Sequence, residues 1–207
     1  DETHIRLTLS RGEKVTSYMD PTVNKFGPTL IILPEWKPTT NRDNDGLQLV
    51  TSSIRRNPPQ CIDSKIHHNN LINNIMAKIE ANVAGVDGAV MMDIEGYVSE
   101  VNATNIFFVD DGKVLTPYAD SCLPGITRQK VIDLCHENDI PVAEKRISMS
   151  EMYTADECFT TGTMGELIPA VEIDQRTIGD GTIGPVTKRL RKLHWELAES
   201  TGEPLPF

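Results

Sequence analysis

The chain has 207 residues, of which 39% are hydrophobic and 24% are charged, and its formal net charge at pH 7 is −10. An acidic chain without a basic stripe is not typical of nucleic-acid binders, and no run of about 18 apolar residues is present that would cross a membrane. The length allows one sizeable domain, alone or with part of a second, and the first residues do not resemble a secretion signal, so we expect a cytoplasmic protein.

Two strands are predicted in the N-terminal part of the chain. Residues 4–9 alternate between apolar and polar side chains, which is typical of a strand, and the short apolar run at 29–33 predicts a buried strand. The stretch 35–46 is rich in Pro, Asn, Asp and Thr, which is the composition of a linker. This composition indicates a domain boundary there.

The middle of the chain predicts a strand at 47–53, then a helix and two hairpins. The helix runs from about Asn69 to Ala84, because apolar residues recur at helical spacing and Gly85 is a natural stop. These apolar residues are Leu71, Ile75, Ile79 and Val83, with Ile72 and Met76 beside them. The two hairpins have glycine-containing turns and pair 89–94 with 97–101 and 106–109 with 113–116.

The C-terminal part predicts two more helices with strands between them. One helix runs from Thr127 to about Asn138 with Val131, Leu134 and Cys135 facing inward, and the last begins at Pro185, since proline is favoured at a first helical position. Strands are expected near 142–147, 157–161 and 167–173. Hairpins mixed with helices favour an α+β fold over a doubly wound α/β sheet.

Two ionisable residues are candidates for chemistry. Lys65 lies in DSKIHHNN, where a lysine is ordinarily a solvated surface charge, but a partly desolvated lysine can attack an aldehyde. Glu100 lies in YVSEVNATNIFFV, and the alternation there places Val98, Glu100 and Asn102 on one strand face. Such a glutamate either faces solvent or faces a ligand, in which case it can pair with a ring nitrogen.

Three segments offer groups to an anion, although none of them is specific alone. Gly125-Ile126-Thr127 opens a helix, with Thr127 as the expected N-cap, and free N–H groups at a helix start suit a phosphate. Residues 160–163 offer hydroxyls and loop amides, and Arg55-Arg56 is either an anion site or a solvated pair. No histidine or cysteine has metal-ligand spacing, so we expect no metal. Reduced, packed thiols are expected at Cys61, Cys122, Cys135 and Cys158.

Taken in order, these segments resemble the class IV aminotransferases of pyridoxal 5′-phosphate (PLP) fold type IV. The matching stretches are DSKIHHNNLINNIMAKIEA, EGYVSEVNATNIFFVDDGKVLTP, CLPGITR, YTADECFTTGTMGELIP and IGDGTIGPVTKRL. The resemblance implies that 47–207 forms the larger, PLP-binding domain of this α+β fold. It also implies a linker at 39–46 and the end of a smaller N-terminal domain at 1–38.

The resemblance further implies roles for individual residues. Lys65 matches the lysine that binds the cofactor covalently and moves the proton at the substrate Cα. Glu100 matches the glutamate that pairs with the pyridine nitrogen, and Asn105 lies beside it. The remaining matched cofactor-binding positions are Leu123, Gly125, Ile126, Thr127, Gly162 and Thr163. Substrate contacts are expected from Arg6, Thr163 and Met164, and a structural role from Arg128.

The chain departs from the family pattern at several places. No segment matches the helix that carries the family's phosphate-binding arginine, and Asn70 stands where branched-chain enzymes have a tyrosine. Arg6 matches a substrate-binding arginine of branched-chain enzymes, whereas Thr16 and Tyr18 stand where D-amino acid transaminases have an arginine and a histidine. These matches favour branched-chain enzymes over D-amino acid transaminases.

We therefore expect a homodimer that transfers an amino group between a branched-chain or similar L-amino acid and a 2-oxo acid. The alternatives are a PLP-dependent lyase of the aminodeoxychorismate type, a D-amino acid transaminase, or a catalytically incomplete PLP-fold fragment. The lyase differs from the aminotransferases because its turnover needs no 2-oxo acid acceptor.

Overall fold

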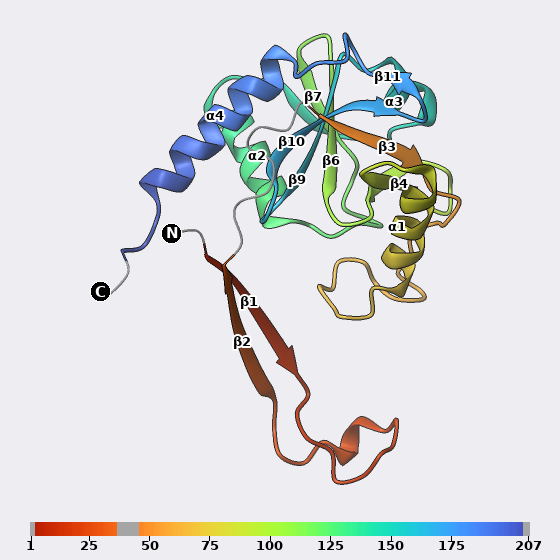
Figure 1. Cartoon of the computed structure of the whole chain (residues 1–207). Coiled ribbons are helices and arrows are strands. Elements are labelled where there is room, and N and C mark those ends of the chain that lie inside the picture. Colours follow the sequence, from red (N-terminus) through yellow and green to blue (C-terminus); the bar gives the residue numbers. More distant parts are fainter. Residues whose placement is uncertain (1–2, 37–45, 205–207) are drawn as a thin grey trace. The chain divides into compact units, whose positions relative to one another are not determined.

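A computed structural model of the chain describes residues 3–36 and 46–204 (Figure 1). The chain forms two units, Asp1–Arg42 and Asp43–Phe207. The predicted linker at 39–46 lies outside the described residues except for Gly46. That the first unit is the end of a smaller domain stays a prediction.

The first unit is a two-stranded antiparallel sheet. β1 (Thr3–Ser10) pairs with β2 (Thr29–Trp36), and the short 3-10 helix η1 (Pro21–Val23) lies in the connection between them. The prediction of a buried strand at 29–33 is wrong, because the side chains from Leu30 to Leu33 are 48–58% exposed. A two-stranded sheet has no layer of its own to cover its faces.

The second unit is built on a mixed sheet of nine strands, counted over residues 46–204. Their order is β5-β4-β3-β10-β9-β6-β7-β8, with β11 beside β10. Both predicted hairpins are confirmed as the antiparallel pairs β4–β5 and β6–β7, whereas β3 runs parallel to both of its neighbours. The strands are β3 (Leu47–Thr51), β4 (Gly88–Met92), β5 (Val98–Val101), β6 (Asn105–Asp110), β7 (Lys113–Thr116), β8 (Val142–Glu144), β9 (Glu157–Gly162), β10 (Glu166–Ile173) and β11 (Arg176–Thr177).

Helices cover both faces of this sheet (Figure 1). α2 (Ile126–Glu137) and α4 (Pro185–Ser200) pack on one face, towards which Phe107 of β6 points and stacks on Phe159 with ring centroids 5.0 Å apart. The next residue along, Phe108, points to the other face and packs in the cluster that contains Met152 of α3 (Met149–Thr154). Successive side chains of a strand point to opposite faces, so the consecutive buried residues Phe107 and Phe108 require that both faces of the sheet are covered.

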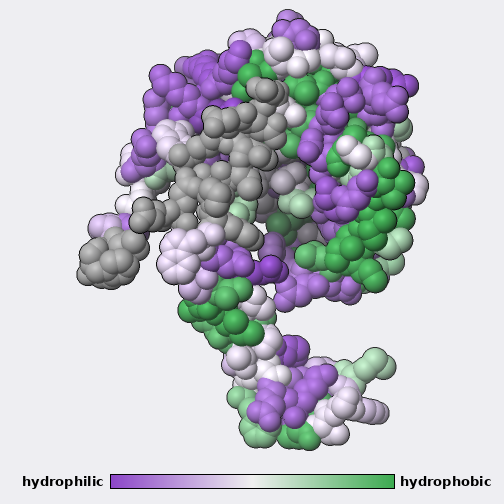
Figure 2. Space-filling model, viewed as in Figure 1, coloured by the Kyte–Doolittle hydropathy of each residue, from purple (hydrophilic) through white to green (hydrophobic). Residues whose placement is uncertain are grey.

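α1 (Ile72–Ala84) confirms the predicted helix, although it begins later than Asn69. Its only fully buried side chains among the described residues are Ala77 and Ala81, which pack against Ala89 and Met91 of β4. The apolar residues that predicted the helix are exposed, and Figure 2 shows a hydrophobic surface over α1. The helical spacing therefore marks a surface stripe and not a core contact.

Two further features differ from the expectations. α3 and β11 were not predicted. The prediction of packed thiols holds for Cys122, Cys135 and Cys158, which are buried, but not for Cys61, which is exposed. All four cysteines are free thiols. None of the helices in the described part of the chain is long and apolar enough to cross a membrane.

Candidate functional site

A cavity of about 380 Å³ lies in the second unit where β5 ends, β6 begins and β9 ends. Its lining comes from four segments that are distant in sequence, and it includes every predicted cofactor-binding residue except Lys65. The predicted residues that line it are Glu100, Asn105, Leu123, Gly125, Ile126, Thr127, Gly162 and Thr163. His67 and Thr161 also line it and had not been singled out as cofactor contacts.

Glu100 is the buried acid of this cavity, with 5% of its surface exposed. The prediction that it shares a strand face with Val98 is wrong, because Val98 packs in the hydrophobic core. The register of β4 and β5 shifts so that Met91 lies opposite Glu100 and Met92 lies opposite Val98. The extra residue, Ser99, forms a β-bulge, and a bulge turns the side chains that follow it to the other face.

Both carboxylate oxygens of Glu100 have partners. The Oε1 atom lies 2.7 Å from Nε of Arg56, and both of these side chains are 7% exposed. The Oε2 atom accepts a hydrogen bond of 3.3 Å from the backbone N–H of Leu123. Burial raises the pKa of Glu100 to about 7, although the Arg56 charge and the hydrogen bond from Leu123 act to lower it. Acids with raised pKa values in cavities are common at functional sites.

Arg56 was predicted to be an anion site or a solvated residue, but it is buried against Glu100. Its Nη1 donates to Oδ1 of Asn73 at 2.6 Å and to Oδ1 of Asn74 at 3.1 Å, both in the first turn of α1. Arg55, its neighbour, is exposed. Only the fold brings Arg56 to Glu100, so the sequence signal was limited to the adjacent pair of arginines.

The turn before α2 forms one wall of the cavity. Asn105 is 6% exposed and donates from Nδ2 to the carbonyl of Leu123 at 2.8 Å. A Cβ atom at Gly125 would lie 2.2 Å from Oδ1 of Asn105, so this approach requires glycine. Thr127 is not the N-cap as predicted, because Gly125 occupies that position without a side-chain cap. The first amides of α2 are thus left for another acceptor.

The end of β9 forms another part of the wall. Thr161 is 2% exposed, and its buried Oγ1 has no hydrogen-bond partner among the described residues. A buried hydroxyl without a partner is costly, and a polar ligand in the cavity would satisfy it. Gly162 and Thr163 line the cavity beside it, whereas Met164, a predicted substrate contact, is half-buried outside the lining.

Lys65 is exposed and does not line the cavity. Its backbone N–H donates to Oδ1 of Asp63 at 3.0 Å, and the buried Ser64 anchors the loop through the carbonyl of Asn57. His67, two residues further on, does line the cavity. The lysine therefore belongs to a loop that borders the cavity, while its side chain faces solvent.

The remaining predicted residues lie elsewhere. Arg6 is exposed on β1 in the first unit, so its substrate contact stays a prediction. Arg128 is buried and binds the carbonyl of Pro117 and the carboxylate of Glu144, which is a structural arrangement. Within residues 3–36 and 46–204, no group of three or more His, Cys, Asp or Glu is arranged to hold a metal ion.

Comparisons with known proteins agree on one family. Residues 1–173 match the family described as amino-transferase class IV. The chain is 57% identical over 206 residues to branched-chain-amino-acid aminotransferase-like protein 2 of Arabidopsis thaliana. That match includes 100% of this chain but 37% of the plant protein, so the chain spans well under half of that relative's length.

Solved structures show the same relationship. The T.th. branched-chain amino acid aminotransferase, complexed with N-(5′-phosphopyridoxyl)-L-glutamate, superposes with a TM-score of 0.89 at 34% identity. The match covers 97% of this chain and 66% of that one. The same enzyme complexed with 4-methylvaleric acid gives a TM-score of 0.85 at 35% identity, covering 98% of this chain and 65% of that one.

Proposed function

The chain belongs to the class IV aminotransferase family and has the fold-type IV PLP aminotransferase fold, and from this we propose that it is a PLP-dependent aminotransferase. We propose a branched-chain or similar L-amino acid as the amino donor and a 2-oxo acid as the acceptor. The observation that carries the proposal is the single cavity lined by the predicted cofactor-binding residues from three separate segments.

The residues around the cavity fit PLP chemically. Glu100 would pair with the pyridine nitrogen, and the free first amides of α2 beside Gly125 would donate hydrogen bonds to the phosphate, as helix N-termini do. The hydroxyl of Thr161, which has no partner among the described residues, and the loop at Gly162 offer further polar contacts to a ligand in the cavity. When bound, PLP supplies an electron sink for the substrate's Cα.

The chain's own residues would then perform three tasks. Lys65 would hold the cofactor covalently and, once released, move the proton at the substrate Cα. Glu100 would hold the proton on the ring nitrogen. Asn105 would keep the Leu123–Gly125 turn in place through its hydrogen bond to Leu123. Because Lys65 faces solvent, its side chain must turn towards the cavity when the cofactor enters.

The substrate assignment is supported by the relatives. The T.th. enzyme was crystallised with a phosphopyridoxyl derivative of L-glutamate and with 4-methylvaleric acid, whose branched carbon chain matches that of leucine. We propose the same two substrate types for this chain. Arg6 is the proposed partner of the substrate carboxylate, through the bidentate contact that arginine favours.

The proposal is tested by adding PLP to the purified chain and recording its visible spectrum. We expect a band that Lys65→Ala abolishes and that L-leucine or L-glutamate converts to the spectrum of the aminated cofactor. Hydride reduction followed by peptide mass mapping should place the cofactor on Lys65. The matched control is Lys113→Ala, which removes an exposed lysine on β7 and should leave the band unchanged.

Two outcomes would contradict the proposal in different ways. A PLP band that L-leucine and L-glutamate leave unchanged, together with turnover that needs no 2-oxo acid, would favour the lyase. Absence of any band at excess PLP would mean that the chain alone is not a working PLP protein.

We also propose that the protein acts as a homodimer in which a second copy covers the exposed stripe of α1. The stripe consists of Leu71, Ile72, Ile75, Met76, Ile79 and Val83, which are 42–85% exposed. Contiguous apolar patches of several hundred Å² on a protein surface usually mark an interface.

A further inference from the structure

We propose that Arg56 is a positioning residue for the reaction, which holds the Glu100 carboxylate in place and in its charged form at the wall of the cavity. The inference deepens the proposed function and rests on it, because the charge on Glu100 serves the reaction only if Glu100 pairs with the cofactor. The pairing itself is a property of the chain without cofactor.

The first step is that Arg56 cannot easily leave Glu100. Its guanidinium is fixed on the far side by Asn73 and Asn74, at 2.6 and 3.1 Å. Each of these amides is tied back in turn, since Asn73 donates to the carbonyl of Arg55 at 2.8 Å and Asn74 to that of Asn102 at 2.9 Å. The arginine is therefore held by the start of α1 and not only by the acid.

The second step concerns the kind of contact. The 2.7 Å distance between Nε of Arg56 and Oε1 of Glu100 is an ion-pair distance, and the charge of Arg56 lowers the pKa of Glu100 more than its hydrogen bond does. The attraction is thus mainly between the two charges. Charge attraction is strong at a buried site, where solvent does not screen it.

The third step is that Glu100 needs this charge. Burial favours the protonated acid and raises the pKa of Glu100 to about 7, against the lowering effect of Arg56. Without Arg56 the carboxyl group would stay protonated near neutral pH. A neutral acid could not hold a proton on a ring nitrogen by ion pairing.

The other titratable groups near Glu100 do not replace Arg56. Burial raises the pKa of the Cys122 thiol to about 12, so it is neutral at physiological pH. His67 and His68 line a cavity together with Glu100, but within the described residues neither of them forms an ion pair with it. Arg128 is committed to Glu144 and the carbonyl of Pro117.

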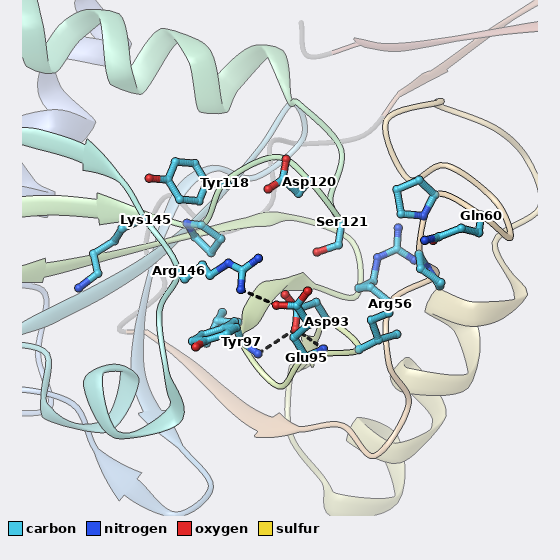
Figure 3. Close-up of a pocket in the computed structure, with 15 residues that line it drawn as sticks. Arg56, Gln60, Asp93, Glu95, Tyr97, Tyr118, Asp120, Ser121, Lys145 and Arg146 are labelled. Carbon is cyan, nitrogen blue, oxygen red and sulfur yellow. Dashed lines mark hydrogen bonds and ion pairs between the residues drawn. The ribbon is translucent and has the colours of Figure 1, made fainter.

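Arg56 also lines a second cavity of about 270 Å³, which contains other carboxylates (Figure 3). Two of these acids have partners of their own, since Glu95 pairs with Arg146 and Asp93 accepts the backbone N–H groups of Glu95 and Tyr97. Figure 3 shows Arg146 turned towards Glu95, to which a dashed line joins it. In the described part of the chain, the ion pair of Arg56 is the one with Glu100.

The test is a titration of Glu100 in the full 207-residue chain without cofactor. Carbon-13 NMR of a glutamate-labelled chain reports each carboxyl group, and Glu100→Gln assigns its signal. We expect Arg56→Gln to raise the pKa of Glu100 by about one to three pH units, the range typical for loss of an adjacent opposite charge. Arg56→Lys keeps a positive charge and should shift it less.

Arg55→Gln is the matched control, because Arg55 is the exposed neighbour and its contact with Asn73 uses only its backbone carbonyl. An unchanged Glu100 titration in Arg56→Gln would overturn the inference. If Arg56→Gln does not fold, the double variant with Glu100→Gln decides. Recovery of folding would show that the unpaired Glu100 carboxyl group was the fault, and failure would show that Arg56 acts only through packing.

PLP binding gives a second readout. We expect Arg56→Gln to shift the low and the high pH values at which the visible band disappears. It should also lower kcat more than it changes KM, and Arg56→Lys should rescue both effects in part. Should the wild-type chain show no band at all, the proposed function fails, while the pairing is still decided by the titration.

Discussion

The charge of Glu100 makes the stability of the cofactor-free chain depend on pH. Its pKa is raised from 4.5 to about 7 by burial, so the folded chain binds this proton more tightly than the unfolded chain does. The stabilising contribution is therefore complete below the unfolded pKa and is lost as pH rises through the folded one. Between about pH 5 and about pH 8 we expect a loss on the order of 2 kcal/mol from this group.

Urea unfolding at a series of pH values tests this expectation, with Glu100→Gln as the reference because it cannot ionise. The free energy of unfolding of the wild type, minus that of the variant, should fall across this pH window. A difference that stays flat, or rises with pH, would show that Glu100 is not a destabilised carboxylate in the empty cavity.

Most cavity residues could be predicted because they belong to short stretches whose order along the chain matches a family. Arg56 could not be predicted in the same way, since its partner is set by the packing of α1 and β5 and not by local spacing. The face of Glu100 was also misassigned, because strict alternation does not reveal the bulge at Ser99. The sequence shows residue types and their order directly, but it does not show which distant residues pair in the folded chain.

α4 depends on a buried acid from another element. Glu157 of β9 is 6% exposed and accepts hydrogen bonds from the backbone N–H groups of Val186 at 2.9 Å and Thr187 at 2.7 Å. It also accepts a hydrogen bond of 2.6 Å from the hydroxyl of Thr187. A carboxylate at a helix N-terminus satisfies free donors and is favoured by the helix dipole.

Glu157→Ala should therefore destabilise the chain by about 3 kcal/mol, because it leaves several buried donors without acceptors. Chemical denaturation measures the change, and hydrogen exchange should show the loss first at the start of α4. Glu199→Ala is the control, since Glu199 is exposed on the same helix. Equal effects of the two substitutions would contradict the capping role.

The elements were predicted best where the pattern was complete within a short window. The hairpins and α4 have apolar runs bounded by turn residues or by Pro185, and the structure confirms them. α3 was missed although Ser148 and Glu151 form a capping box, a signal that the sequence does contain. Periodicity could not show that the apolar stripe of α1 is exposed, because it identifies a face without identifying what covers it.

For the whole molecule, the fold and the family are shown, whereas activity and assembly are proposals. The chain spans 37% of the plant relative and 66% of the T.th. enzyme. The proposed cofactor contacts all lie in the second unit, and the proposed substrate contact, Arg6, lies in the first. The other two expected substrate contacts, Thr163 and Met164, lie in the second unit with the cofactor contacts.

The exposed stripe of α1 predicts self-association. Both charged residues of the helix are tied back to the same chain, Lys78 to the carbonyl of Asp87 at 2.7 Å and Glu80 to Ser52 at 2.5 Å. The stripe is therefore uncharged, and a two-fold pairing would place like apolar surface against like. Two such patches would bury on the order of 1,000 Å², near the lower limit for a specific interface.

We expect light scattering coupled to size exclusion to give the mass of a dimer for the wild-type chain. Ile79→Glu should shift it to the monomer, since each copy would then place an unpaired charge in the apolar contact. Ile94→Glu, at a more exposed isoleucine in the turn after β4, should leave the dimer intact. A monomeric wild type, or a dimer that Ile79→Glu does not weaken, would mean that something other than a second copy covers α1.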